Sequence, residues 1–220
     1  RAALGNGDPG ISAEVENGEG LEDFESDELF DSTVAPGVNI EYPWGEPAFE
    51  CAEKLLKMSS EFDDLNIYSF TTRNRARLEV ALDKLSHPRG SPTLDEVSLF
   101  ARRLRVALEE AIGDKANSLE IEVSTPGAER EIRIPADLER FSDFPMLVRY
   151  HNSTREEQHV MMFHRLDETT KTTHWKLADV RANRWLDKRG KSMPIRRRDR
   201  EREFLISLND LIRVNMHIDV

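Results

Sequence analysis

Negative charge is concentrated at the start of this chain. The 220 residues carry a formal net charge of −11. Residues 1–50 contain 13 acidic residues and one basic residue, whereas residues 51–220 contain 29 acidic and 30 basic residues, so the net charges are −12 and +1. Because a highly charged segment with few hydrophobic residues cannot bury enough apolar surface to fold, we predict a disordered acidic extension over residues 1–45. The folded part of the chain is expected to follow it.

Cysteine content and hydropathy limit the classes of protein that fit. Cys51 is the only cysteine, which excludes an intrachain disulfide and a cluster of thiolates around zinc or iron and sulfur. No stretch approaches the roughly 20 apolar residues of a membrane helix, so we expect no membrane association. The chain opens on Arg1 rather than methionine, and we interpret it as a fragment or as the product of processing, such as removal of a transit peptide.

Two helices are predicted in residues 46–143. Pro47 suits the first position of a helix, and apolar residues recur at helical spacing from there to Met58. Thr93 and Glu96 have the spacing of a capping box and open a long helix that is expected to end at Gly113. A shorter helix is expected over residues 136–141.

Alternating hydrophobic and polar residues predict three strands among these helices, and five more after residue 144. The first group gives an N-terminal α-β-β-α-β domain over residues 46–143, an α+β domain with its helices on one side of a small sheet. The second group predicts a small closed β-barrel over residues 144–220, since closure removes exposed strand edges. The predicted strands are 65–70, 78–83, 119–123, 146–150, 160–166, 175–182, 204–207 and 212–216.

A tight turn is predicted directly after the third strand. Pro126 presets a φ near −65°, and Gly127 supplies the positive φ that a type II turn requires at its third position. Ser124 and Thr125 place hydroxyl groups beside backbone amides at this turn. A purely structural turn, with these hydroxyls satisfied locally, explains the same residues.

The segment around this turn resembles the signature of the ribosome maturation factor RimP family. That signature is an apolar residue followed by Glu, Val, Ser, Ser, Pro, Gly, any residue, an acidic residue and Arg. Identical residues here are Glu122, Val123, Ser124, Pro126, Gly127 and Arg130, and conservative exchanges are Ile121, Thr125 and Glu129. The spacing continues through Pro135, Asp137, Glu139, Arg140 and Phe141. The resemblance implies an α+β domain followed by a small Sm-like or SH3-like barrel.

The chain departs from the family pattern in several places. Ala128 and Glu131 replace an apolar residue and a proline, and the family prefers glycine near Asp143. The acidic extension has no counterpart in the bacterial pattern, and residues 181–202 form an unusual basic insertion. These departures resemble a plant plastid form, so we expect the chloroplast stroma as the location, with the bacterial cytoplasm as the alternative.

The resemblance implies a function without catalysis. It predicts a factor that binds the immature small ribosomal subunit, through a ribosomal protein and rRNA, and is a monomer when free. No catalytic residue or cofactor is expected, because Ser124 lacks the Gly-x-Ser-x-Gly pattern and no phosphate-binding glycine loop is present. No metal ligand is expected, because the six histidines are scattered and His159 and His164 fall on opposite faces of a predicted strand. An RNA-binding or nucleoid-associated protein of the same fold, with a changed partner, is the alternative.

The basic insertion is the second candidate site. Arginines and lysines in such a loop could contact several rRNA phosphates. A solvated hairpin, partly neutralised by Asp199, Glu201 and Glu203, is the competing interpretation. The candidate contact residues are Lys188, Arg189, Lys191, Arg196, Arg197, Arg198, Arg200 and Arg202.

Overall fold

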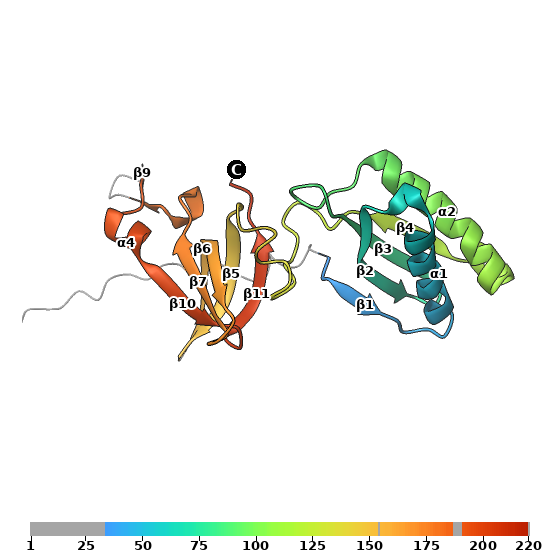
Figure 1. Cartoon of the computed structure of the whole chain (residues 1–220), viewed down its shortest axis with the longest axis horizontal. Coiled ribbons are helices and arrows are strands. Elements are labelled where there is room, and N and C mark those ends of the chain that lie inside the picture. Colours follow the sequence, from blue (N-terminus) through green and yellow to red (C-terminus); the bar gives the residue numbers. More distant parts are fainter. Residues whose placement is uncertain (1–33, 154, 187–190, 220) are drawn as a thin grey trace, which may run out of the picture. The chain divides into compact units, whose positions relative to one another are not determined.

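The first part of the computed structural model is a four-stranded sheet covered by helices (Figure 1). The structure describes residues 34–153, 155–186 and 191–219. The sheet has the order β1-β2-β3-β4, in which β2 and β3 are antiparallel and the two outer pairs are parallel. Its strands are β1 (Gly37–Asn39), β2 (Leu65–Arg73), β3 (Arg77–Lys84) and β4 (Glu120–Ser124).

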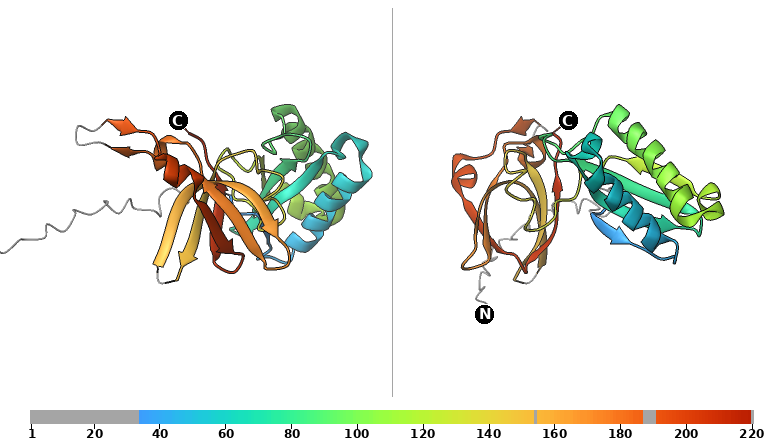
Figure 2. Two further views of the ribbon diagram at one scale, coloured as in Figure 1. Left: turned by 60° about the vertical axis from the view of Figure 1, so that its left-hand side comes forward. Right: turned by 45° about the vertical axis from the view of Figure 1, so that its right-hand side comes forward.

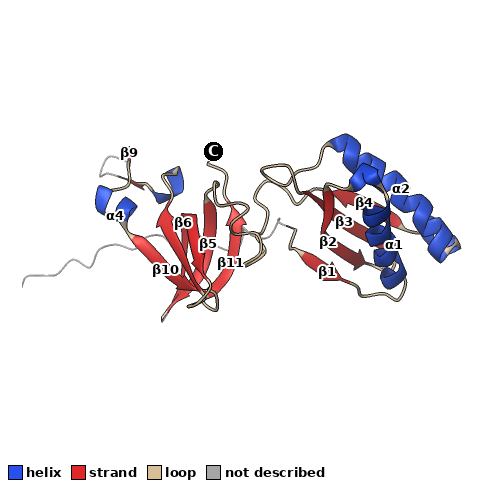
Figure 3. Ribbon diagram, viewed as in Figure 1, coloured by secondary structure: helices blue, strands red, loops and turns tan. Residues whose placement is uncertain are grey.

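Helices α1 (Gly45–Met58) and α2 (Leu94–Ile112) lie on the same face of this sheet (Figure 3). The short 3₁₀ helix η1 (Ser60–Phe62) follows α1, and the short helix α3 (Asp114–Asn117) follows α2. The apolar faces of the helices and sheet form one core, whose largest fully buried members include Phe62, Phe70, Phe100, Leu78, Leu82, Leu104 and Leu108.

The local signals that open and close α2 are confirmed. The Thr93 hydroxyl accepts a hydrogen bond from the Glu96 amide, and the Glu96 carboxylate accepts one from the Thr93 amide at 2.8 Å, which is the reciprocal capping box. Gly113 ends the helix with a φ of +57°. The helices predicted from Pro47 and from Thr93 and all three predicted strands of this domain are therefore present.

The start of the first sheet differs from the sequence predictions. Strand β1 lies within residues 1–45, where no regular structure was predicted, and it pairs in parallel with β2. All three residues of β1 are exposed, so the strand has no alternation of apolar residues that the sequence could reveal. Residues 1–33 of the predicted extension lie outside the described residues.

The prediction of a short helix over residues 136–141 is wrong. These residues form consecutive turns, in which the Asp137 amide bonds to the Arg133 carbonyl and the Leu138 amide bonds to the Pro135 carbonyl. Because the hydrogen bonds switch between spacings of four and three residues, no regular α-helical ladder forms.

The second part is a strongly curved five-stranded antiparallel sheet (Figure 2). Its order is β10-β7-β6-β5-β11, and the core on its inner face contains Trp175, whose Nε1 donates to the Thr173 hydroxyl at 2.7 Å. Its strands are β5 (Met146–Asn152), β6 (Arg155–Asp167), β7 (Thr172–Leu177), β10 (Glu203–Ser207) and β11 (Leu211–Met216).

The sequence predicted a closed, Sm-like or SH3-like barrel, but the sheet is not closed. Strands β10 and β11 are the two edges of the sheet and have no register with each other among the described strands. The outer edge of β11 is already occupied, because the Ile132 amide donates to the Val214 carbonyl at 2.7 Å and the Met216 amide donates to the Arg130 carbonyl at 2.9 Å. The segment after the signature turn therefore covers the edge that closure would have used.

The insertion of residues 181–202, which we call the basic arm, lies between β7 and β10. It contains a 3₁₀ turn, η2 (Arg181–Asn183), a small antiparallel ribbon of β8 (Trp185–Leu186) and β9 (Ser192–Met193), and helix α4 (Arg197–Glu201). No helix in the described part of the chain is long and apolar enough to cross a membrane.

Candidate functional site

The signature segment follows β4 directly, but its turn lies at Ala128 and Glu129 and not at Pro126 and Gly127 as predicted. Gly127 has a φ of +85°, which confirms the left-handed backbone expected at this position. Pro126 is buried, whereas Gly127 is exposed. Glu122, in β4, forms an ion pair with Arg77 of β3 at 2.5 Å on the surface. Ser124 and Thr125 are half-buried at the end of the strand.

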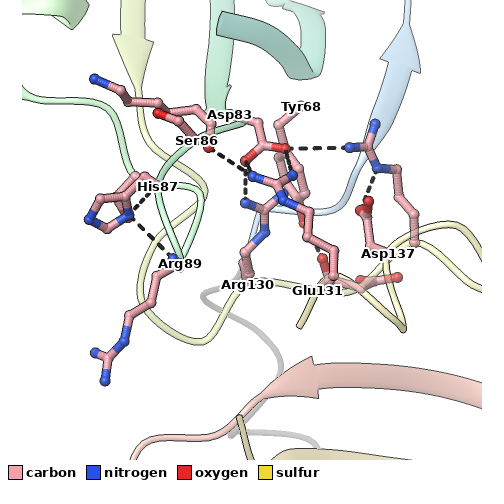
Figure 4. A network of polar contacts seen from close by, with 12 residues as sticks. Tyr68, Asp83, Ser86, His87, Arg89, Arg130, Glu131 and Asp137 are labelled. Atoms are coloured by element: carbon pink, nitrogen blue, oxygen red, sulfur yellow. Dashed lines mark hydrogen bonds and ion pairs between the residues drawn. The ribbon is translucent and has the colours of Figure 1, made fainter. Parts of the chain in front are cut away.

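Arg130, the last residue of the signature, is fully buried. Its Nη1 atom lies 2.6 Å from the Oδ1 atom of Asp83 in β3 (Figure 4). Its guanidinium carbon lies 4.5 Å from the ring centroid of Tyr68 and 4.9 Å from that of Phe141. The two aromatic rings and the carboxylate compensate for part of the hydration that this cation loses on burial, while its Nε and Nη2 atoms have no hydrogen-bond partner among the described residues.

Asp83 also forms ion pairs with two further arginines. Arg140 donates to both carboxylate oxygens, at 2.5 and 3.2 Å, and Arg133 approaches within 3.5 Å. Burial alone would raise the pKa of Asp83, but the hydrogen bonds from Arg140 and Arg130 outweigh it and the net pKa is lowered. Asp83 is therefore an ionised counter-charge at neutral pH and is unsuited to act as a general base.

The Tyr68 hydroxyl connects this cluster to the backbone of two other segments. Its hydroxyl lies 2.8 Å from the Glu131 carbonyl and 3.0 Å from the Val34 carbonyl, and its single proton can be donated to one of them at a time. Burial raises the pKa of Tyr68, which keeps the phenol protonated at neutral pH.

Gly90 packs directly against the ion pair. It has a φ of +68°, and a β-carbon at this position would overlap the Nη1 atom of Arg130 and the Oδ1 atom of Asp83. The loop is fixed by hydrogen bonds from the Lys84 amide to the Gly90 carbonyl and from the Gly90 amide to the His87 carbonyl. Only glycine combines this backbone conformation with so close an approach.

We call Tyr68, Asp83, Gly90, Arg130, Arg133, Arg140 and Phe141 the arginine clamp. The clamp fixes the segment after the signature turn to β2 and β3. The same segment is bonded to β11, where Arg213 also pairs with Glu131 at 2.8 Å. Among the residues of the clamp, no nucleophile lies beside a base.

Asp83 was not recognised as a site residue from the sequence. Its signal is a charged residue near the end of β3, where the neighbouring Ala81 and Leu82 are buried as well. A fully buried aspartate requires a cationic partner, but the sequence alone does not identify Arg130, 47 residues later, as that partner.

The described arginines of the basic arm are exposed, and all but Arg181 and Arg184, which lie at η2, are in or beside α4. Arg197 pairs with Glu201 at 2.8 Å, Arg200 pairs with Asp179 at 2.5 Å, and Arg198 is exposed between them. Arg196 lies over the Trp185 ring and Arg202 over the Phe204 ring, at 5.4 and 4.7 Å. Lys191 is exposed beside β9, whereas the predicted contact residues Lys188 and Arg189 lie outside the described residues.

A groove of about 650 Å³ lies beside α4, lined by residues of β5, β6, β7, β10 and the arm. Arg155 and Arg202 line it together with His159, whose ring lies 5.9 Å from that of Phe204. Burial lowers the pKa of His159, so this ring is mostly neutral at neutral pH. Within residues 34–153, 155–186 and 191–219, no group of three or more His, Cys, Asp or Glu residues is placed to hold a metal ion.

Comparisons with known proteins agree with the signature. Residues 131–217 match a family described as a domain of unknown function, DUF7912. The chain is 36% identical over 90 residues to the ribosome maturation factor RimP of Leptospira interrogans serogroup Icterohaemorrhagiae serovar copenhageni, covering 41% of this chain and 54% of that protein. It is also 36% identical over 80 residues to RimP of Leptospira biflexa serovar Patoc, covering 35% and 48%. The chain thus spans about half the length of the curated relatives that it matches.

Proposed function

We propose that this protein is a non-enzymatic assembly factor for the bacterial-type small ribosomal subunit. The similarity to two proteins named ribosome maturation factor RimP is the observation that carries the proposal. The matching signature residues support it, because Arg130 of that signature is a buried member of the arginine clamp. The proposed partners are a small-subunit ribosomal protein and rRNA.

The proposed mechanism is binding without chemistry. A protein that binds one conformation of an immature subunit more tightly than the alternatives shifts the population toward that conformation. The clamp suits this role because it fixes the signature segment, through Asp83 on one side and β11 on the other. A binding surface that is already rigid loses less conformational entropy when the complex forms.

The plastid is the compartment that we propose, with the bacterial cytoplasm as the alternative. The acidic extension supports this choice because the bacterial family pattern lacks it. Expression of the complete reading frame with a C-terminal fluorescent protein in plant cells, followed by imaging against chlorophyll, tests it. Fluorescence restricted to a compartment other than the plastid would contradict the proposal.

Sedimentation of native extract through a sucrose gradient tests the main proposal. We expect the protein to comigrate with small subunits that contain unprocessed rRNA, and to be depleted from translating ribosomes. Depletion of the protein should increase the proportion of precursor rRNA. A protein found only in light fractions, with unchanged rRNA processing after its depletion, would contradict an assembly role.

A second candidate function is suggested by the basic arm. An RNA-binding or nucleoid-associated protein of the same fold would use this surface on a partner other than the ribosome. Release from heavy fractions by nuclease distinguishes the two, because a nucleoid protein is released by DNase whereas an assembly factor leaves with dissociated subunits. Release by DNase would favour the second function.

A further inference from the structure

The basic arm is positively charged, although the chain as a whole is negatively charged. Residues 181–202 contain ten basic and three acidic residues, a net charge of +7. Since the whole chain has a net charge of −11, all other residues together carry −18. A positive segment of this density attracts a polyanion even when the whole protein is acidic, because screening limits the reach of charge to about 10 Å.

The described part of the arm is anchored to the sheet at several points. The side-chain amide of Asn183 donates to the carbonyls of Ala178 and Val160, and the Arg181 amide donates to the Asp219 carboxylate at 2.9 Å. Ile195 is buried, and Arg200 pairs with Asp179. These contacts use few of the charged groups, so most of the guanidinium groups are presented to solvent on an anchored backbone.

Trp185 gives the arm an aromatic surface among these charges. It is 43% exposed, which is more than is usual for a tryptophan. The guanidinium carbon of Arg196 lies 5.4 Å from its ring centroid. An exposed indole backed by an arginine can stack on an unpaired base, whereas the bases of a duplex are already stacked on one another.

We infer that the basic arm binds single-stranded RNA, with Trp185 stacking on a base and Arg197 and Arg198 contacting phosphates. The inference deepens the proposed function, on which the choice of RNA as the polyanion rests. Charge complementarity selects a polyanion, and the exposed Trp185 selects an unpaired strand. Duplex DNA satisfies the charge but offers no unstacked base, and an acidic peptide satisfies the charge but offers no regular array of phosphates.

Binding of the purified full-length chain to a short, fluorescein-labelled single-stranded RNA tests the inference by fluorescence anisotropy across a range of salt concentrations. The variant Arg197→Gln with Arg198→Gln removes two exposed charges from α4. Arg102→Gln with Arg103→Gln removes two exposed charges from α2 and is the matched control. Trp185→Leu removes the stacking surface. Melting midpoints show whether each variant is folded.

The α4 variant is expected to weaken binding and to reduce the slope of log Kd against log salt by about 1.4, which corresponds to two lost contacts at about 0.7 each for a single strand. Trp185→Leu is expected to weaken binding by about fivefold or more. It should also strongly reduce the quenching of tryptophan fluorescence by RNA, since Trp175 is fully buried and Trp44 is half-buried against the core of the first sheet. The α2 control should bind as the natural chain does.

Three results would overturn the inference. They are equal losses in the α4 variant and the α2 control, a Trp185→Leu variant that binds RNA normally, and tighter binding to duplex DNA or an acidic peptide than to single-stranded RNA. Sedimentation with precursor subunits is a separate measurement. RNA binding through the arm without comigration would refute the assembly role alone, and comigration without RNA binding would refute this inference alone.

Discussion

The Nη1 atom of Arg130 lies 2.6 Å from the Oδ1 atom of Asp83, and neither side chain is exposed to solvent. This pair joins the last residue of the signature to the end of β3. Arg133 and Arg140 also pair with Asp83, and two aromatic rings lie against the guanidinium group of Arg130. Removing one partner of a buried pair leaves the other charge uncompensated, which costs more than the pair contributes when intact.

Asp83→Asn is therefore expected to lower the free energy of unfolding by about 3 kcal/mol or more. The change keeps the size of the side chain, removes its charge and replaces one acceptor oxygen by an NH₂ donor. Urea denaturation followed by circular dichroism measures the effect. Asp143→Asn is the control, since Asp143 is exposed and its loss should change stability by about 0.5 kcal/mol or less. Equal effects of the two substitutions would show that the clamp does not stabilise the fold.

The lowered pKa of Asp83 predicts a pH dependence. Its ordinary pKa is 3.8 and its pKa in the folded state is lower. A carboxyl group of this kind contributes stability that is present above the pKa of the unfolded state and is lost as pH falls through the folded-state pKa. The difference in unfolding free energy between the natural chain and Asp83→Asn should therefore be constant from about pH 7 to pH 5 and should shrink below about pH 3.8.

Urea titrations at several pH values measure this difference. The comparison with Asp83→Asn is necessary because Glu96, Glu157, Asp167 and Glu203 also have lowered pKa values, and their contributions cancel between the two proteins. A difference that grows as the solution becomes more acidic would contradict an ionised Asp83 in the clamp.

Gly90→Ala is expected to destabilise the fold more than Gly127→Ala. Both glycines have positive φ, so each substitution incurs about 1–2 kcal/mol of backbone strain. At Gly90 the new methyl group also overlaps Arg130 and Asp83, whereas at Gly127 it meets no atom within 4 Å. Thermal denaturation of both variants isolates the cost of the overlap. Equal melting midpoints would mean that the loop carrying Gly90 can move away from the clamp.

Local signals in the sequence predicted most of the elements. The capping box at Thr93, the left-handed Gly127 and the alternation of β2 and β3 each depend on residues that are close in the chain. The prediction of a type of turn requires only the φ preferences of proline and glycine. These elements therefore follow from the sequence without knowledge of the tertiary structure.

The remaining features depend on contacts between distant residues. The edge of β11 bonds to residues 130–132, more than 80 positions earlier, and this pairing replaced the closure that was predicted. The clamp likewise joins Asp83 to Arg130 across 47 positions. Arg130 was included among the signature residues by resemblance, but nothing in its local sequence indicated that it is buried.

Residues 34–45 belong to the first sheet and not to the removable part of the acidic extension. The sequence placed the boundary at residue 45, yet β1 pairs with β2, the Glu41 amide donates to the Thr72 hydroxyl at 2.8 Å, and the Val34 carbonyl lies within hydrogen-bond distance of Tyr68. Gly45 is buried, and a β-carbon there would approach Ile40 and Thr72 at 2.6 and 2.8 Å. These contacts tie residues 34–45 to the first sheet.

A chain that starts at residue 46 is therefore expected to melt at a lower temperature than one that starts at residue 34. The shorter deletion keeps every contact named above, whereas the longer one exposes the outer edge of β2 and leaves the Thr72 hydroxyl without its backbone donor. The loss of several backbone hydrogen bonds, each contributing about 0.5–1.5 kcal/mol, should shift the midpoint by several degrees in thermal denaturation. Equal midpoints for the two deletions would show that β1 does not stabilise the sheet.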